Sequence, residues 1–197
     1  MIVFLRHGQT TSNERGLLVG RSDPALTALG ERQALALRPL LTRVREVWSS
    51  PLARARATAE LALPDLVATL QPAFVEVDYG QLEGQPLGAV SLEQWRLLES
   101  DHSRPLGDGE SLASVDARVH RELEALLADP TSWLHDEHQD LAIVSHVSPI
   151  KSAVAWALGV PGAVAWRTRL DNGSLTTVMV RRATPVLVNF NVVPPPG

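Results

Sequence analysis

The chain opens with MIVFLRHGQT at residues 1–10, an apolar run that ends in Arg6, His7 and Gly8. A short apolar run, Met1 to Leu5, that is closed by a turn-forming glycine is typical of a fully buried β-strand. Arg6 and His7 therefore stand at the carboxyl end of the expected strand. Open α/β sheets bind ligands at that end of their strands, so polar residues in this position are candidates for a functional site.

Strands and helices alternate along the rest of the chain. We expect further strands at residues 44–48, 73–77 and 141–144, and a late pair at residues 174–180 and 186–190 with no helix between them. Helical patterns occupy residues 29–40, 52–63, 92–99, 112–127 and 149–158. This order predicts an α/β fold, a three-layer sandwich whose mostly parallel central sheet is flanked by helices, with the late pair as antiparallel edge strands. Residues 1–197 show no internal repeat or linker and are expected to form a single domain.

Composition excludes several classes of protein. With 45% hydrophobic and 20% charged residues the chain resembles an ordinary globular protein, not a disordered or fibrous one. The net charge of −4 offers no broad basic field, so no nucleic-acid partner is expected. The absence of cysteine excludes disulfides, thiolate metal sites and cysteine nucleophiles. No secretory leader or apolar run of membrane-spanning length is found, so we expect a cytoplasmic protein without a membrane partner.

The polar residues that follow the expected strands form a chemically consistent set, namely Arg6, His7, Arg54, Glu76 and His146. A phosphomonoester carries two negative charges near neutral pH, and the planar guanidinium of arginine suits its oxygens. An imidazole attacks phosphorus only when it is unprotonated, and the charge of Arg6 lowers the pKa of the adjacent His7. A carboxyl group near phosphate has a raised pKa, which would allow Glu76 to protonate a leaving alkoxide. The set predicts phosphoryl transfer with histidine as the nucleophile.

Two of these assignments have neighbours that compete with them. Asp78 shares one face of the expected strand at residues 73–77 with Glu76, and we favour Glu76 as the proton donor. Arg56 lies two residues after Arg54, and we interpret Arg56 as part of an exposed helix face. Glu83 is expected to support the site without touching the substrate.

Five segments, in this order, resemble the histidine phosphatase superfamily, also called the phosphoglycerate mutase-like family. They are LRHGQT at 5–10, SSPLARARATA at 49–59, VEVDYGQLEG at 75–84, GDGES at 107–111 and IVSHVSPIK at 143–151. The match spans about residues 1 to 180, and an ordered set of this kind is highly specific. The resemblance implies a phosphoglycerate mutase-like fold.

The resemblance also implies roles for the candidate residues. His7 would become phosphorylated, Arg6, Arg54 and His146 would hold the phosphoryl oxygens, and Glu76 would protonate the leaving group and then activate water. Asn13 falls where the family often places another phosphate contact. No metal and no organic cofactor are implied. Val147 and Ser148 depart from the family, which commonly has glycine after the second histidine, and we expect this to alter the pocket shape.

The resulting prediction is a phosphomonoesterase, a histidine acid phosphatase-type phosphoric monoester hydrolase that acts on a small phosphorylated metabolite through a phosphohistidine. A phosphoglycerate mutase is the enzymatic alternative, and a non-catalytic phosphate-binding domain is the other. The interval 84–109 carries only two basic residues, Arg96 and Arg104, whereas cofactor-dependent mutases have a longer basic insertion there, and this favours hydrolysis. A homodimer through the late strands would be compatible with the pattern.

Other noticeable side chains receive simpler interpretations. The polar run at residues 135–138 lacks the spacing of a zinc site and is expected to be a solvated loop. We expect Trp95 to form a pocket wall, and the other four tryptophans to pack in the core or an interface, namely Trp48, Trp133, Trp156 and Trp166. His102 and His120 have no partner that the sequence reveals.

Overall fold

The computed structural model of the protein describes residues 1–105, 107–129 and 139–196. Its centre is a six-stranded sheet in the order β3-β2-β4-β1-β5-β6. The four strands β3, β2, β4 and β1 are parallel, and β5 and β6 add an antiparallel hairpin at one edge. The strands span Ile2–Arg6 (β1), Val44–Ser49 (β2), Thr69–Leu70 (β3), Asp140–Ser145 (β4), Leu175–Arg181 (β5) and Thr184–Val192 (β6).

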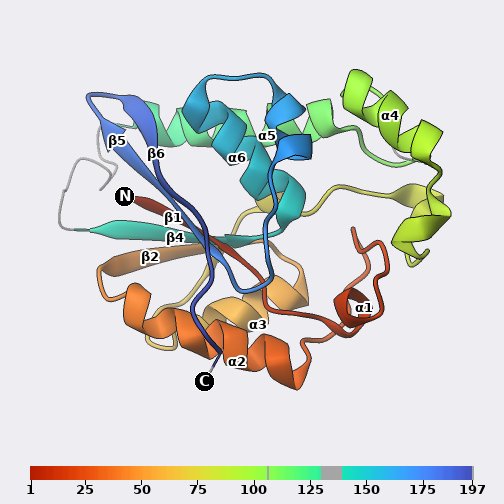
Figure 1. Cartoon of the computed structure of the whole chain (residues 1–197). Helices are drawn as coiled ribbons and strands as arrows, with labels where there is room; N and C mark the ends of the chain where they lie inside the picture. The colour runs from red at the N-terminus through yellow and green to blue at the C-terminus, as the bar shows by residue number, and fades with distance from the viewer. Residues whose placement is uncertain (106, 130–138, 197) are drawn as a thin grey trace.

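Helices cover both faces of this sheet, as Figure 1 shows. On one face lie α2 (Ala28–Leu37) and α3 (Ala53–Ala62), and on the other α5 (Leu112–Ala128) and α6 (Val147–Leu158). The short α1 (Thr11–Glu14) and α4 (Leu92–Ser100) lie to one side, beyond the strand ends. Short 3₁₀ segments span Arg38–Leu40, Pro72–Phe74, Gly80–Leu82, Leu87–Ala89 and Gly162–Arg167. The predicted three-layer α/β sandwich with a mostly parallel sheet is confirmed.

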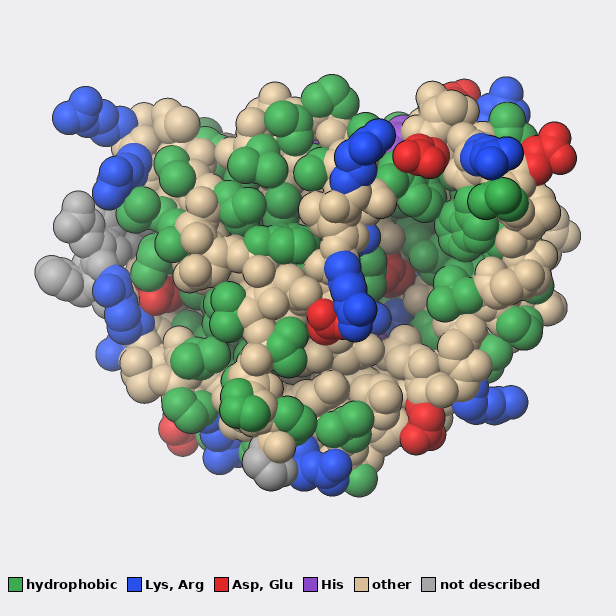
Figure 2. Space-filling model, viewed as in Figure 1, with side chains coloured by type: hydrophobic (Ala, Val, Ile, Leu, Met, Phe, Trp, Pro, Cys, Tyr) green, Lys and Arg blue, Asp and Glu red, His purple; other side chains and the backbone are tan. Residues whose placement is uncertain are grey.

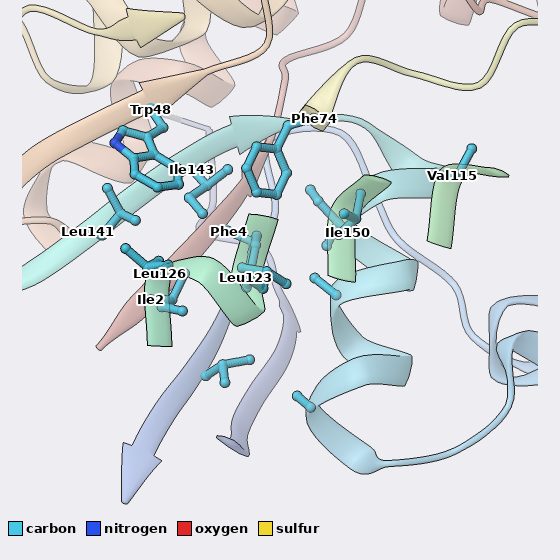
Figure 3. Close-up of a cluster of buried hydrophobic side chains, with 14 of the residues drawn as sticks. Ile2, Phe4, Trp48, Phe74, Val115, Leu123, Leu126, Leu141, Ile143 and Ile150 are labelled. Carbon is cyan, nitrogen blue, oxygen red and sulfur yellow. The ribbon is translucent and has the colours of Figure 1, made fainter. Parts of the chain in front are cut away.

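Alternation along the strands places their buried side chains in two clusters, one on each face of the sheet. Ile2 and Phe4 of β1 face α5 and α6, whereas Val3 and Leu5 face α2 and α3. Figure 3 shows the first cluster, in which aromatic rings and aliphatic side chains from both layers meet, among them Phe4, Trp48, Phe74, Leu123, Ile143 and Ile150. Such strands are buried on both faces, which explains why β1 and β4 appear in the sequence as continuous apolar runs.

One predicted strand is wrong. Residues 73–77 form no strand, and β2 pairs instead with the short β3 (Thr69–Leu70). Pro72 begins a 3₁₀ turn in which the Val75 amide donates to the Pro72 carbonyl at 3.2 Å. From Phe74 to Val77 all four consecutive residues are buried, so the two-residue alternation of a half-buried strand is absent. Glu76 and Asp78 therefore do not share a strand face.

The register of the parallel strands brings distant residues together. Arg6 of β1 pairs with Ser145 of β4, so His7 and His146, the next residues on each strand, leave the sheet side by side. The Ser50 amide donates to the Val144 carbonyl at 2.9 Å, which adds the end of β2 to the same edge. The candidate residues that follow β1, β2 and β4 in the sequence therefore lie together at the carboxyl end of the sheet.

Gly8 is required by close packing between the loop after β1 and the start of α2. A Cβ atom at position 8 would lie 2.2 Å from the Gly30 carbonyl oxygen, and one at position 30 would lie 2.1 Å from the Gln9 carbonyl oxygen. Contacts this short with backbone atoms cannot be relieved by a side-chain rotation. The glycine beside His7 therefore fixes how the histidine-bearing loop sits on α2.

Two features of the surface complete the description. Within the part of the chain that the structure describes, no helix has the length and apolar character needed to cross a membrane. Strand β6 lies at the sheet edge with Val186, Val188 and Val192 partly exposed. The homodimer through the late strands stays a prediction.

We expect Gly8→Ala to lower the free energy of unfolding by about 1–3 kcal/mol, because the added methyl group must displace backbone. Gly88→Ala is the matched control, since a Cβ atom there meets nothing within 4 Å, and it should stay within about 0.5 kcal/mol of the parent. Urea denaturation followed by circular dichroism measures both. Equal stability of the two variants would contradict the packing argument.

Candidate active site

His7 is buried and its tautomer is set by its surroundings. The ring is 3% exposed, and Nδ1 donates to the Gly8 carbonyl at 2.7 Å. The other nitrogen, Nε2, faces the Arg54 Nε–H at 3.3 Å, from which it can only accept. Both contacts agree that Nδ1 carries the proton and that the lone pair is on Nε2. His7 is therefore arranged as a nucleophile.

Burial and positive charge keep His7 and His146 neutral. Desolvation lowers the pKa of His7 well below 6.5, and the guanidinium groups of Arg54 and Arg6 lower it further. The pKa of His146 is also lowered well below 6.5, first by desolvation and then by neighbouring positive charge, of which Arg54 is the leading source. The two rings lie 5.0 Å apart between centroids. His146 Nε2 is 2.8 Å from the Ser50 hydroxyl, and its Nδ1 is buried without a hydrogen-bond partner among the described residues.

Arg54 is fully buried and is held by backbone carbonyls. Its Nη1 donates to the Ser22 carbonyl at 2.6 Å and its Nη2 to the Gly20 carbonyl at 2.8 Å. Asp23 adds a longer ion pair at 3.6 Å to Nη1. Desolvation lowers the pKa of Arg54, while the carboxylates of Glu76, Asp23 and Glu83 oppose that shift. With both terminal nitrogens bound, the guanidinium has a fixed orientation against His7.

Glu83 holds the loop that in turn holds Arg54. Its carboxylate accepts the Gly20 amide at 2.7 Å, the Arg21 amide at 3.2 Å and the Ser22 amide at 3.2 Å. A Cβ atom at position 20 would lie 2.3 Å from the Val77 carbonyl oxygen, so the loop packs tightly on the segment that bears Glu76. The expected supporting role of Glu83 is thus given a structural basis.

Arg6 presents a second guanidinium from the end of β1. Its Nη1 donates to the Leu170 carbonyl at 2.5 Å, and its Nε is buried without a hydrogen-bond partner in the described part of the chain. Burial lowers the pKa of Arg6 to about 10, against the opposing charges of Glu76 and Asp171. Arg6 therefore remains a cation at neutral pH.

Glu76 lies buried against the N-terminus of α6. Its Oε1 accepts the Ser148 amide at 3.1 Å and its Oε2 the Val147 amide at 3.0 Å. Free amides and the helix dipole make this a favourable place for a carboxylate. Val147 and Ser148, which depart from the family pattern, are ordinary helical residues whose backbone binds Glu76, and neither has a positive φ.

The competing residues play other parts. Asp78 is half-buried and its Oδ1 accepts the Gly80 amide at 2.8 Å, so it closes a local turn. Arg56 is exposed on α3, in agreement with its interpretation as a surface residue. Glu76 and Arg54 are therefore the buried members of the two pairs, whereas Asp78 is half-buried and Arg56 is exposed.

Asn13 and Asn172 link the site to two further segments. Asn13 Oδ1 accepts the Thr10 amide at 3.1 Å and the Asn172 Nδ2 at 3.1 Å, which leaves the Asn13 NH₂ group as its donor for a ligand. Asn172 also donates to the His7 carbonyl at 3.3 Å. Asn172 was not found from the sequence, because it lies in a loop before β5 and belongs to none of the segments singled out there.

Glu110 and Arg118 form another pair that sequence reasoning missed. Arg118 Nε donates to Glu110 Oε1 at 2.9 Å, and its Nη1 donates to the Ala73 carbonyl. Arg118 Nη2 lies 3.5 Å from the Glu76 carbonyl oxygen. The pair therefore clamps the backbone on which Glu76 is carried. The GDGES segment marked a helix start, but nothing in it showed that Glu110 would bind an arginine eight residues later.

The remaining polar residues are placed outside this cluster. His102 accepts the Trp166 indole N–H at 2.9 Å, and His120 lies 3.1 Å from the Ser152 carbonyl oxygen. The run at residues 135–138 lies outside the described residues, as does Trp133. In the described ranges no group of three or more histidine or acidic side chains is placed to hold a metal ion.

Comparison with known proteins finds relatives that match nearly the whole chain. The family model of the histidine phosphatase superfamily (branch 1) matches residues 2–193. Phosphoserine phosphatase 1 of Hydrogenobacter thermophilus is 30% identical over 97% of this chain and 92% of its own. The probable phosphoglycerate mutase GpmB of Erwinia tasmaniensis is 32% identical over 90% of this chain and 83% of its own.

Two solved structures are similar over nearly the whole chain. Phosphoserine phosphatase of Entamoeba histolytica in complex with 3-phosphoglyceric acid has a TM-score of 0.85 at 25% identity, covering 98% of this chain and 96% of that one. The mycobacterial glucosyl-3-phosphoglycerate phosphatase complexed with VO₃ has a TM-score of 0.87 at 26% identity, covering 97% and 98%.

The lowered pKa values of His7 and His146 predict a pH dependence of stability. Below pH 6.5 the unfolded chain binds protons that the two buried neutral rings do not, so the free energy of unfolding should fall as the pH falls from about 6.5 to 5. The slope is at most about 1.4 kcal/mol per pH unit for each ring. Urea titrations of the parent and of His7→Asn at pH 5, 6 and 7 measure it. The variant should show a shallower slope, and identical slopes would contradict the assignment.

Proposed function

The chain belongs to the histidine phosphatase superfamily, and from that premise we propose that it hydrolyses phosphomonoesters through a phosphohistidine formed on His7. One observation carries the proposal. The His7 Nε2 lone pair is buried next to two arginines that lower its pKa, so an unprotonated nucleophile lies where a phosphoryl dianion would be held.

In the first step His7 Nε2 attacks phosphorus, an N–P bond forms and the P–O bond to the leaving alcohol breaks. Arg6 and Arg54 balance the charge on the phosphoryl oxygens, and their fixed guanidinium groups need no rearrangement for this. Glu76 supplies the proton that converts the leaving alkoxide to an alcohol.

Two buried nitrogens support this placement of the phosphoryl group. Arg6 Nε and His146 Nδ1 have no partner among the described residues, and an unpaired buried polar atom is costly. When the Ser50 hydroxyl donates to His146 Nε2, the proton of that ring is on Nδ1, which then serves as a donor. Phosphoryl oxygens would satisfy both nitrogens.

In the second step a water molecule attacks the phosphohistidine. The Glu76 carboxylate accepts a proton from this water, the N–P bond breaks, and inorganic phosphate leaves with His7 restored. The amides of Val147 and Ser148 hold the Glu76 carboxylate in one position through both proton transfers. The proton that Glu76 gives to the leaving group in the first step is thus returned by water in the second.

We further propose a small phosphorylated metabolite as the substrate of this acid phosphatase-type reaction. The names of relatives support hydrolysis, since they include phosphoserine and glucosyl-3-phosphoglycerate phosphatases. Phosphoryl transfer between hydroxyls is the second candidate, because another relative is named as a probable mutase. Conversion of 3-phosphoglycerate to 2-phosphoglycerate without release of phosphate would select that candidate. Binding of phosphoesters without any turnover would select the non-catalytic alternative.

We expect His7→Ala to abolish hydrolysis of every phosphomonoester, because no other described side chain presents a lone pair at this position. Release of inorganic phosphate measures the loss. Acid-labile, alkali-stable labelling from a ³²P-phosphoester should be found in the parent during turnover and should vanish in the variant. Activity retained at more than about a hundredth of the parent rate would exclude the covalent route.

We expect Glu76→Gln to lose most activity on alkyl phosphates and much less on p-nitrophenyl phosphate, whose phenolate leaves without a proton. Asp78→Asn is the matched control, since Asp78 only closes a turn, and it should depress neither substrate selectively. The ratio of kcat values for the two substrates is the measurement. An equal loss on both substrates for Glu76→Gln would assign Glu76 a purely structural role.

A further inference from the structure

A cavity of about 300 Å³ lies beside the segment that follows Glu76 and the N-terminus of α6. Val147 and Ser148, whose amides bind the Glu76 carboxylate, form part of its wall. Val77 and Tyr79, from the segment that carries Glu76, form another part. An alcohol whose oxygen receives a proton from Glu76 would therefore extend into this cavity.

Aromatic rings form the outer wall of the cavity. Trp95 of α4 and Trp166 meet edge to face with ring centroids 5.8 Å apart. The Trp166 indole N–H is already donated to His102, which fixes the ring and leaves its apolar surface to the cavity. Figure 2 shows a hollow at the side of the molecule where α4 lies, with hydrophobic side chains along the α4 side and Lys or Arg side chains along the opposite side. A wall of this kind favours flat, apolar groups.

The cations of the cavity are already engaged. Lys151 Nζ donates to the Ala165 carbonyl at 2.7 Å and to the Thr168 carbonyl at 2.6 Å. Arg104 points to the surface, where its Nε pairs with Asp101 at 3.2 Å and its side chain is 59% exposed. Neither is placed as a buried clamp for a carboxylate of the leaving group.

The carboxylates of the cavity add to this preference. Glu110 is paired with Arg118 at 2.9 Å, but Asp116 has no ion pair among the residues that the structure describes. A leaving group with its own carboxylate would meet the Asp116 charge, and like charges placed close together are unfavourable.

We propose that the cavity selects phosphomonoesters of uncharged, apolar, ring-bearing alcohols and disfavours those whose alcohol carries a carboxylate. This inference rests on the proposed function, because it concerns the leaving group of that reaction. Trp95 and Trp166 are, in this proposal, residues that determine specificity. The preferred leaving group then differs from those in the names of two relatives, which specify phosphoserine or a phosphoglycerate derivative.

The test compares benzyl phosphate with 4-carboxybenzyl phosphate. Both esters release a benzylic alkoxide, so the chemical step is matched and the remote carboxylate is the difference. We expect kcat/KM to be at least about tenfold higher for benzyl phosphate. Equal values, or a preference for the carboxylate that Arg104→Gln removes, would overturn the inference while leaving the phosphatase intact.

Substitution of the aromatic wall provides the second arm. Trp95→Ala should lower kcat/KM for benzyl phosphate about tenfold and leave methyl phosphate, which does not reach the wall, within twofold. Leu92→Ala is the matched control on the same helix, because Leu92 is 65% exposed and does not line the cavity. Unchanged selectivity in Trp95→Ala would contradict the assignment, and the methyl phosphate rate reports whether the variant is folded.

A binding measurement separates failure of this inference from failure of the proposed function. Calorimetry with benzylphosphonate and 4-carboxybenzylphosphonate requires no turnover. Tighter binding of benzylphosphonate without hydrolysis of any ester would support the cavity assignment and overturn the phosphatase. No hydrolysis together with no preference between the phosphonates would overturn both.

Discussion

Two buried cations share one buried carboxylate at the carboxyl end of the sheet. Arg6 and Arg54 are both desolvated, and Glu76 is the leading opposing charge for each of them. Removing charges from water is costly, so this cluster is maintained by hydrogen bonds that the fold supplies from elsewhere. Desolvation first, and then the positive charge of the arginines, keeps the two histidines beside it neutral. Burying these charges therefore lowers the stability of the fold at the place where the chemistry requires a lone pair and an anion-binding surface.

Each member of the cluster is held by backbone. Carbonyls of the loop at residues 20–22 bind Arg54, the Leu170 carbonyl binds Arg6, and amides of α6 bind Glu76. Two carboxylates outside the cluster fix two backbone segments of the site. Glu83 holds the loop at residues 20–22, and Glu110, through Arg118, holds the segment that carries Glu76. Backbone groups cannot rotate away as side chains can, so the positions are set before a ligand arrives.

The sequence identified the parts of this site that follow directly from strand ends. His7 and His146 were found because β1 and β4 are apolar runs whose next residues are polar, and the parallel register places them side by side. The strand expected at residues 73–77 was wrong because Pro72 begins a 3₁₀ turn and tertiary burial covers four residues in succession. Asn172, Glu110 and the carbonyls that bind Arg54 were missed because their partners are set by tertiary packing of loops against other segments, which leaves no periodic pattern in the sequence.

The site divides into two halves of different origin. The half proposed to hold the phosphoryl group is built on strand ends and is fixed by the register of the sheet. The cavity proposed for the leaving group is built largely from segments outside the sheet, namely α4, α5, α6 and the 3₁₀ turn at Gly162–Arg167. A substitution at Trp95 or Trp166 can therefore change which alcohol fits without moving His7. Proteins that share this sheet can accordingly differ in substrate, because function follows from the walls of the site and not from the fold that carries it.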